Sequence, residues 1–137
     1  MIASNRSKTS APAMPDPPDT LSGGARDLWN QLATKLYESG RLSDLDAPAF
    51  AGICRAYGRW LEAEQQIDEQ GAVVKNHAGF AVANPFLAVS KSAWKQYLDG
   101  CSAFGLTPKA RGEGARRQAA NAIASSNPRS TRTQRAT

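Results

Sequence analysis

Cationic side chains gather at one end of the chain. After position 108 a single acid, Glu113, stands among seven basic residues: Lys109, Arg111, Arg116, Arg117, Arg129, Arg132 and Arg135. Residues 16–108 hold 8 basic and 11 acidic residues, so the net charge of +5 is carried by the ends of the chain. A basic segment on a near-neutral body indicates a polyanionic partner, although the same composition also serves solubility alone. Because no aromatic residue is interleaved with the arginines at 111–117, contact with a phosphate backbone is favoured over readout of bases.

No group of side chains in the sequence is arranged for catalysis. His77, the single histidine, lies in the turn-like stretch NHAG with no nucleophile or carboxylate beside it, so it lacks what a general base needs. Asp44 and Asp46 are explained more simply as acids near a helix N-terminus than as metal ligands. The acids of residues 62–69 fit a solvated helix face, and no P-loop lysine motif is present. We therefore predict no enzyme activity, no cofactor and no metal site.

Cysteine usage and hydropathy point to the interior of a cell. Cys54 and Cys101 fall on apolar faces of expected helices, which predicts two buried thiols in a reducing compartment. No apolar run approaches the ~20 residues of a membrane span, and the first ten residues lack the apolar segment of a signal peptide. A soluble intracellular protein with no membrane partner is expected.

The first half of the chain predicts two amphipathic helices. The first runs over about 22–39, with Ser22 as its N-cap and Gly40 in the left-handed position that ends it. The second runs over about 46–70. We prefer Asp46 to Ser43 as its N-cap, because Pro48 then lies in the first turn, where its missing N–H costs nothing.

The second half begins with a change of period. Two short β-prone pieces, 73–74 and 80–82, flank a turn and predict a small hairpin, which alone is only marginally stable in water. A third helix is then expected from Asn84 as N-cap to a stop at Gly105. Thr107 and Pro108 begin a further segment, about 107–124, whose helical character is weakened by two glycines.

These elements give a mainly α fold: a three-helix core with a small β-hairpin between helices 2 and 3, a disordered N-terminus and a basic C-terminal segment. We expect a disordered tail over 1–20, a helical core and oligomerisation domain over 21–106, and a basic segment over 107–137 that is partly helical and then disordered. The tryptophans at 29, 60 and 94 lie on apolar stripes and are expected to pack in the core. A long second helix with few neighbours on its own chain indicates self-association.

The order of these signals resembles the phage terminase small subunit in its short helical form. The resemblance covers about residues 21–111. It rests on a first helix with the L…A…W pattern, a G-x-L…D connection, a Tyr- and acid-rich second helix, a hairpin ending in NP, and FGLTPKAR. The matching residues are Leu21, Ala25, Trp29, Gly40, Leu42, Asp46, Tyr57, Gly71, Asn84, Pro85, Phe104, Gly105, Leu106, Thr107, Pro108 and Arg111.

The resemblance implies a non-enzymatic DNA-packaging factor in the cytoplasm of a host bacterium. Such proteins assemble into rings, recognise the packaging-initiation region of double-stranded viral DNA, and recruit the large subunit that carries the ATPase and nuclease. Many also have an N-terminal helix-turn-helix domain, which residues 1–20 here are unsuited to form. DNA contact is therefore expected from the helical core, the basic segment, or both. A salt slope near −5 would follow if about six cations met phosphates.

Two other hypotheses fit the same residues. One is a helical DNA-binding regulator unrelated to packaging, and the other is a structural oligomerisation adaptor for which DNA is irrelevant.

Overall fold

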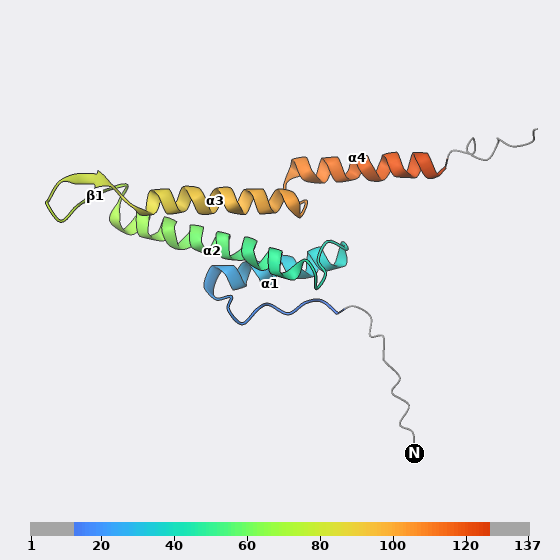
Figure 1. Ribbon diagram of the computed structural model, residues 1–137, viewed down its shortest axis with the longest axis horizontal. Coiled ribbons are helices and arrows are strands. Elements are labelled where there is room, and N and C mark those ends of the chain that lie inside the picture. The colour runs from blue at the N-terminus through green and yellow to red at the C-terminus, as the bar shows by residue number, and fades with distance from the viewer. Residues whose placement is uncertain (1–12, 127–137) are drawn as a thin grey trace, which may run out of the picture. The chain divides into compact units, whose positions relative to one another are not determined.

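The computed structural model describes residues 13–126, so of the tail expected to be disordered over 1–20 only residues 13–20 are described, and residues 127–137 lie outside the described residues. The elements, in chain order, are α1 (Gly23–Glu38), α2 (Ala47–Gln70), β1 (Val73–Lys75), β2 (Ala81–Ala83), α3 (Phe86–Ala103) and α4 (Pro108–Ser125) (Figure 1). The predicted fold class is confirmed: the protein is mainly helical, with a two-stranded antiparallel hairpin between α2 and α3. The chain divides into a first unit up to Tyr97 and a second unit from Leu98, which we describe separately.

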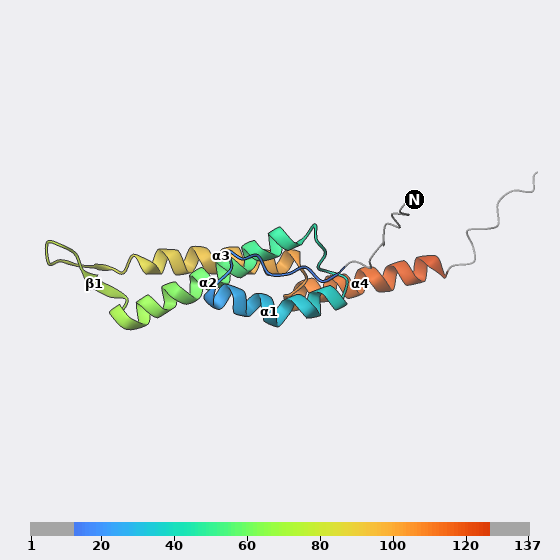
Figure 2. The same cartoon turned by 90° about the horizontal axis from the view of Figure 1, so that it is seen from below.

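The first unit is built on the packing of α1 against α2, which lie side by side in both Figure 1 and Figure 2. Trp29 of α1 and Phe50 of α2 are 1 % and 0 % exposed, and their ring centroids are 4.9 Å apart. Burial of a large apolar side chain of this kind contributes about 1.5–3 kcal/mol. The first unit therefore has its hydrophobic centre where these two rings meet.

The two helices approach closely where α2 carries Gly58. A Cβ atom at Gly58 would lie only 3.0 Å from the backbone nitrogen of Ala25 and 3.1 Å from its Cβ. Any larger residue at position 58 would push the start of α1 away from α2, because the atoms it meets include backbone rather than a flexible side chain. Gly58 thus fixes how near the N-terminal turn of α1 comes to α2.

The predicted end of α1 is confirmed. The Gly40 N–H donates to the carbonyl of Tyr37 over 3.0 Å, and the Arg41 N–H donates to that of Leu36 over 2.8 Å. These two bonds form a Schellman motif, in which Gly40 takes the left-handed conformation with φ of +73°. Leu42 follows and is buried.

The predicted N-caps of α1 and α2 are correct in position but wrong in chemistry. Ser22 precedes α1 and Asp46 precedes α2, yet neither side chain accepts a capping hydrogen bond. The Asp46 carboxylate instead accepts from the N–H and hydroxyl of Ser43, over 3.2 and 2.8 Å. The carbonyl of Ser43 already accepts from the Ala47 N–H at 3.0 Å, so the chain turns helically from Ser43 and Asp46 reaches back, as in a capping box.

The hairpin pairs Val73 with Ala83, Val74 with Val82 and Lys75 with Ala81. The first strand is one residue longer than predicted, and the second is shifted by one residue, because Phe80 lies outside β2. Its turn is closed by Asn76, whose side-chain oxygen accepts from the N–H groups of Ala78 and Phe80, each over 3.0 Å. Gly79 supplies the positive φ, +81°, that this turn requires. Figures 1 and 2 show the hairpin extending beyond the end of α2.

Asn84 fastens the base of the hairpin to the two helices that flank it. Its side-chain amide donates to the carbonyl of Gly71 over 2.9 Å, and its side-chain oxygen accepts from the Phe86 N–H over 3.0 Å. Its backbone N–H donates to the carbonyl of Ala72 over 2.9 Å, and the residue is 1 % exposed. The predicted cap of the third helix is therefore confirmed, and the same side chain also holds the end of α2.

The residues that α3 buries in the first unit are small. Ser90 and Ala93 are buried, and the Ser90 hydroxyl donates to the carboxylate of Glu64 on α2. The larger residues Leu87 and Trp94 are each 38 % exposed, so Trp94 does not lie in the core as predicted. Small side chains let two helices approach closely, so the large residues lie along the edge of the contact.

The second unit contains the end of α3 and α4. The Leu106 N–H donates to the carbonyl of Cys101 over 2.8 Å, and Gly105 has a φ of +69°, which ends α3. The hydroxyl of Thr107 then accepts from the Ala110 N–H over 3.2 Å and caps α4, with Pro108 in the first turn. The prediction that FGLTP joins a helix end to a new helix start is confirmed.

We predict that Asn84→Ala lowers the free energy of unfolding by about 1–3 kcal/mol, because it leaves the Gly71 carbonyl and the Phe86 N–H without their side-chain partner. Urea unfolding followed by circular dichroism measures the change. Asn30→Ala, at an exposed position of α1, is the matched control and should be nearly neutral. Equal stability of the two variants would contradict the proposed fastening.

We also predict that Gly112→Ala with Gly114→Ala strengthens α4 by up to about 1 kcal/mol per site. A Cβ at either position meets open space, so only the backbone entropy changes. Slower amide hydrogen exchange in residues 108–125 is the readout. The same change at Gly58 should instead destabilise the first unit, and a gain in stability there would show that α1 can move aside.

Candidate nucleic-acid interface

The cations predicted to contact DNA lie on α4 as far as the structure describes them. Lys109, Arg111, Arg116 and Arg117 are all exposed. Arg129, Arg132 and Arg135 lie outside the described residues. Because this part of the basic segment is helical, its four cationic side chains project in defined directions around α4.

One side of α4 carries most of this charge. Lys109 and Arg116 are seven residues apart and share a face, because seven residues make nearly two turns, and Arg117 borders this face about 80° round the helix from Lys109. Arg111 is about 200° away from Lys109 around the helix and points to the other side. The structure therefore brings three of the four described cations together and separates Arg111 from them.

An acid lies in the middle of the cationic face. Glu113 is four residues after Lys109 and four before Arg117, spacings that place the side chains near one another on a helix. Lys109 and Glu113 also line one shallow cavity of about 180 Å³, together with Thr107. Glu113 therefore reduces the net positive charge of this face, so a count of the basic residues alone overstates it.

Residues of the resembling motif have structural roles wherever the contacts are resolved. Trp29 is in the core of the first unit, and Asn84 fastens the hairpin. Gly105 and Thr107 end one helix and begin the next. Pro85 is exposed and precedes α3, and Pro108 begins α4. The motif thus marks helix boundaries and packing, and it contains no chemically reactive constellation.

A half-exposed aromatic cluster joins α2 to α3 in the first unit. Trp60 and Trp94 have ring centroids 4.6 Å apart, and Tyr57 and Tyr97 are 5.3 Å apart. Trp94 also lies 5.3 Å from Tyr97. Core packing was predicted for all three tryptophans, which is wrong for Trp94: one side is used in the cluster and the other faces solvent. This cluster could have been predicted from the sequence, because each helix carries two aromatic residues three positions apart, a spacing that places them on the same face.

The residues considered for other chemistry remain scattered. His77 is exposed in the turn of the hairpin, as predicted, and both cysteine thiols are buried, also as predicted. Across residues 13–126, no group of three or more histidine, cysteine, aspartate or glutamate side chains is placed to hold a metal ion. None of the helices described is long and apolar enough to cross a bilayer.

Comparison with known proteins gives one family. The family model described as "Phage terminase, small subunit" matches residues 25–121, from the first turn of α1 to within α4. Searches of curated proteins and of solved structures gave no match. The matched range takes in both helices of the core, the hairpin, the junction at Gly105 and the cationic helix. The chain therefore belongs to the phage terminase small-subunit family, whose role is in the packaging of viral DNA.

Proposed function

We propose that this protein is the oligomeric DNA-recognition component of a terminase. It binds double-stranded viral DNA at the packaging-initiation site, and it recruits and regulates the large subunit that carries ATPase and nuclease activity in the host cytoplasm. The observation that carries the proposal is the family match, which extends from α1 into α4. Small subunits of this family are generally non-catalytic.

The division of labour we propose follows the charge. Residues 21–106 form the self-associating core, and residues 107–137 supply an arm that contacts phosphates. Lys109, Arg116 and Arg117 are exposed on one side of α4, where their cationic groups can reach a duplex without disturbing any packed residue. Arg129, Arg132 and Arg135 extend the same arm along the sequence. Repetition of this arm around an oligomer adds individually weak contacts through effective concentration.

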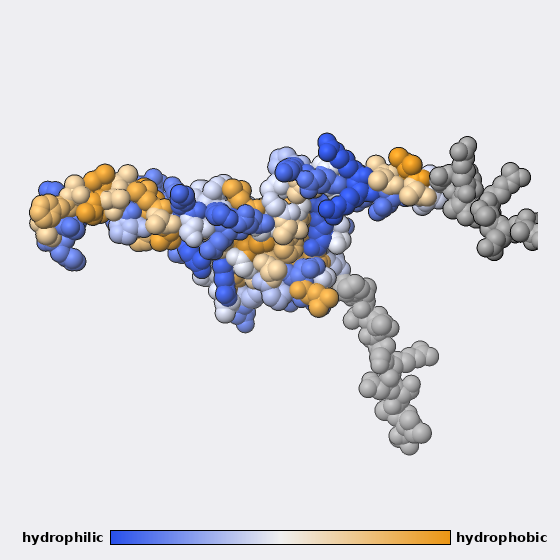
Figure 3. Space-filling model, turned by 45° about the horizontal axis from the view of Figure 1, so that its top comes forward, coloured by the Kyte–Doolittle hydropathy of each residue, from blue (hydrophilic) through white to orange (hydrophobic). Residues whose placement is uncertain are grey.

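Self-association is supported by apolar surface on the first unit. Phe80 and Val73 of the hairpin region are 69 % and 64 % exposed, and Leu87 and Trp94 are half-exposed along α3. Figure 3 shows hydrophobic residues at the surface over the hairpin and the start of α3. Contiguous apolar surface of this kind marks an interaction site, and a two-stranded hairpin needs a further surface to rest on.

The occupant we propose for this surface is a second copy of the chain. A hairpin that docks on the α2–α3 edge of the next copy makes a contact between two different patches, and repetition of such a contact closes into a ring when the rotation permits. The exposed aromatic side of Trp94 supplies a flat apolar surface for such docking. This arrangement accounts for the exposed residues on both the hairpin and α3.

Duplex binding tests the DNA half of the proposal. Arg116→Gln with Arg117→Gln should reduce the magnitude of the log–log salt slope by about 1.8 per bound subunit, because two phosphate contacts are lost. Fluorescence anisotropy with a duplex from the packaging-start region, over a salt series, measures the slope. Lys35→Gln with Lys91→Gln removes the same charge from exposed positions of α1 and α3, and should leave the slope nearly unchanged. An equal effect of both pairs would indicate a response to net charge alone.

The oligomer is tested at the hairpin. Phe80→Ser should shift the protein towards monomer at micromolar concentration, because it removes the largest exposed apolar side chain of the hairpin. Size-exclusion chromatography with light scattering gives the mass. Leu45→Ser is the control, since Leu45 is 92 % exposed in the connection between α1 and α2 and should not change the mass. A wild-type protein that is monomeric throughout would refute the ring.

The packaging role itself is tested with the large subunit. If this protein stimulates the ATPase of the large subunit, it is not a DNA-binding regulator unrelated to packaging. A structural adaptor, in turn, would associate but give no shift of duplex in a gel. Addition of the wild-type protein to the large subunit should raise ATP turnover, and a null result with a competent large subunit would count against the proposal.

A further inference from the structure

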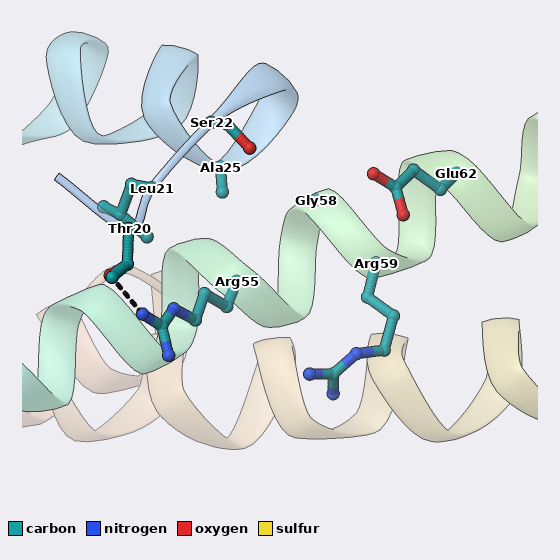
Figure 4. A pocket seen from close by; sticks show the side chains of 8 residues that line it. All are labelled: Thr20, Leu21, Ser22, Ala25, Arg55, Gly58, Arg59 and Glu62. Carbon is teal, nitrogen blue, oxygen red and sulfur yellow. Dashed lines mark hydrogen bonds between the residues drawn. The ribbon is translucent and has the colours of Figure 1, made fainter. Parts of the chain in front are cut away.

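A cavity of about 210 Å³ lies between the start of α1 and the middle of α2, within the first unit. Its lining joins the segment before α1, the first turn of α1 and two turns of α2: Thr20, Leu21, Ser22, Ala25, Arg55, Gly58, Arg59 and Glu62. Figure 4 shows Arg55 reaching from α2 to Thr20, with Arg59 one turn further along the helix. None of these residues belongs to the basic C-terminal segment.

Two arginines give the cavity its chemistry. Arg55 donates to the hydroxyl of Thr20, which holds its guanidinium at the edge of the cavity. Arg59, four residues later on α2, makes no hydrogen bond or ion pair with any residue of 13–126. A guanidinium offers five N–H donors in a planar fork that matches the oxygens of a phosphate. Arg55 and Arg59 lie one turn apart on α2, but the Arg59 side chain points away from the start of α1 in Figure 4, so contact of both guanidinium groups with one phosphate requires a rotamer change of Arg59.

The start of α1 adds further donors. Gly58 lets this turn lie close to α2, since its missing Cβ would be 3.0 Å from the nitrogen of Ala25. The side chain of Ser22 forms no capping bond, and no acidic residue occupies the first turn. The leading N–H groups of α1 therefore lack a side-chain acceptor, and the positive end of the helix dipole lies beside the arginines.

One acid limits the charge of the cavity. Glu62 lies on α2 beside Arg59 and lines the same cavity, yet no ion pair joins it to any residue in the described part of the chain. With two cations and one anion among its lining side chains, the cavity carries a single formal positive charge. That charge is matched by one phosphodiester, which is singly negative.

We propose that this cavity holds one backbone phosphate of duplex DNA, as a second contact made by the helical core and separate from the basic C-terminal segment. The phosphate oxygens accept from Arg55, Arg59 and the leading N–H groups of α1. The contact positions the duplex without reading its sequence. This inference rests on the proposed function, because it takes the chain to be a duplex-binding protein.

The test compares full-length variants by fluorescence anisotropy with a duplex, at 50 to 200 mM salt. Arg55→Gln with Arg59→Gln should weaken binding about tenfold, as expected for loss of a hydrogen-bonded charged contact. It should also lower the magnitude of the salt slope by about 0.9 per bound subunit. Lys35→Gln with Lys91→Gln removes the same charge elsewhere on the first unit and should change affinity by less than about twofold.

A variant that is expected to raise the affinity for duplex distinguishes loss of the site from misfolding, which would only lower it. Glu62→Gln removes the anion from the cavity and should tighten duplex binding, a result that loss of structure does not produce. Arg55→Lys with Arg59→Lys keeps the charge and should retain the salt slope. It should also lose part of the affinity, because lysine lacks the planar fork.

The outcomes separate this inference from the function beneath it. The core site is refuted, and the DNA-binding function stands, in either of two cases in which the wild-type protein binds duplex. In the first, Arg55→Gln with Arg59→Gln has the same effect as the control Lys35→Gln with Lys91→Gln. In the second, Glu62→Gln does not change the affinity. If the wild-type protein fails to bind duplex at 50 mM salt, the proposed function itself fails, and the core site with it.

Discussion

The close approach of α1 to α2 at Gly58 is the constraint on which the first unit depends. Because position 58 has no side chain, the backbone of Ala25 comes near enough to α2 for Trp29 and Phe50 to meet. The same approach places the N-terminal turn of α1 beside Arg55, and so creates a cavity with hydrogen-bond donors on two of its walls. One absent methyl group thus governs both the core and the charged site that we infer.

The rest of the first unit follows the same rule, in which small residues are buried and large ones lie at the edges. Ser90 and Ala93 allow α3 to approach α2, and the hydroxyl of Ser90 binds Glu64. Trp60 and Trp94 then pack against each other at the margin, where Trp94 remains 38 % exposed. Asn84 extends this edge by fixing the hairpin at the end of α2. The result is a small unit with a fully buried centre and an exposed apolar border, on which we propose that another copy docks.

The two sites that we propose for DNA differ in how the structure holds their charge. The basic segment offers cations on α4, a helix that buries no residue and contains two interior glycines, so its order depends little on tertiary packing. The cavity of the first unit holds its donors on two packed helices, and the bond from Arg55 to Thr20 restrains one of them. An exposed arm supplies attraction over distance, whereas a site between packed helices supplies a fixed orientation. Together they would serve the duplex-binding role that we propose.

The sequence by itself determined the order and type of the elements. Periodic apolar residues, the prolines at 48, 85 and 108, and the glycines at 40, 71 and 105 define helix boundaries locally, because capping and proline geometry depend on a few neighbouring residues. It also determined the family, since the signals at these boundaries occur in a characteristic order. Only the tertiary structure decided which apolar residues are buried.

Periodicity identifies an apolar face of α3. It does not show that Ser90 and Ala93 form the contact with the rest of the first unit while Leu87 and Trp94 flank that contact. The side chain that Asp46 serves and the cavity at Arg55 and Arg59 were likewise beyond the sequence. The cavity depends on how close α1 and α2 lie, and that distance is set by the packing of residues far apart in the chain, whereas the contact between Asp46 and Ser43 joins residues only three apart.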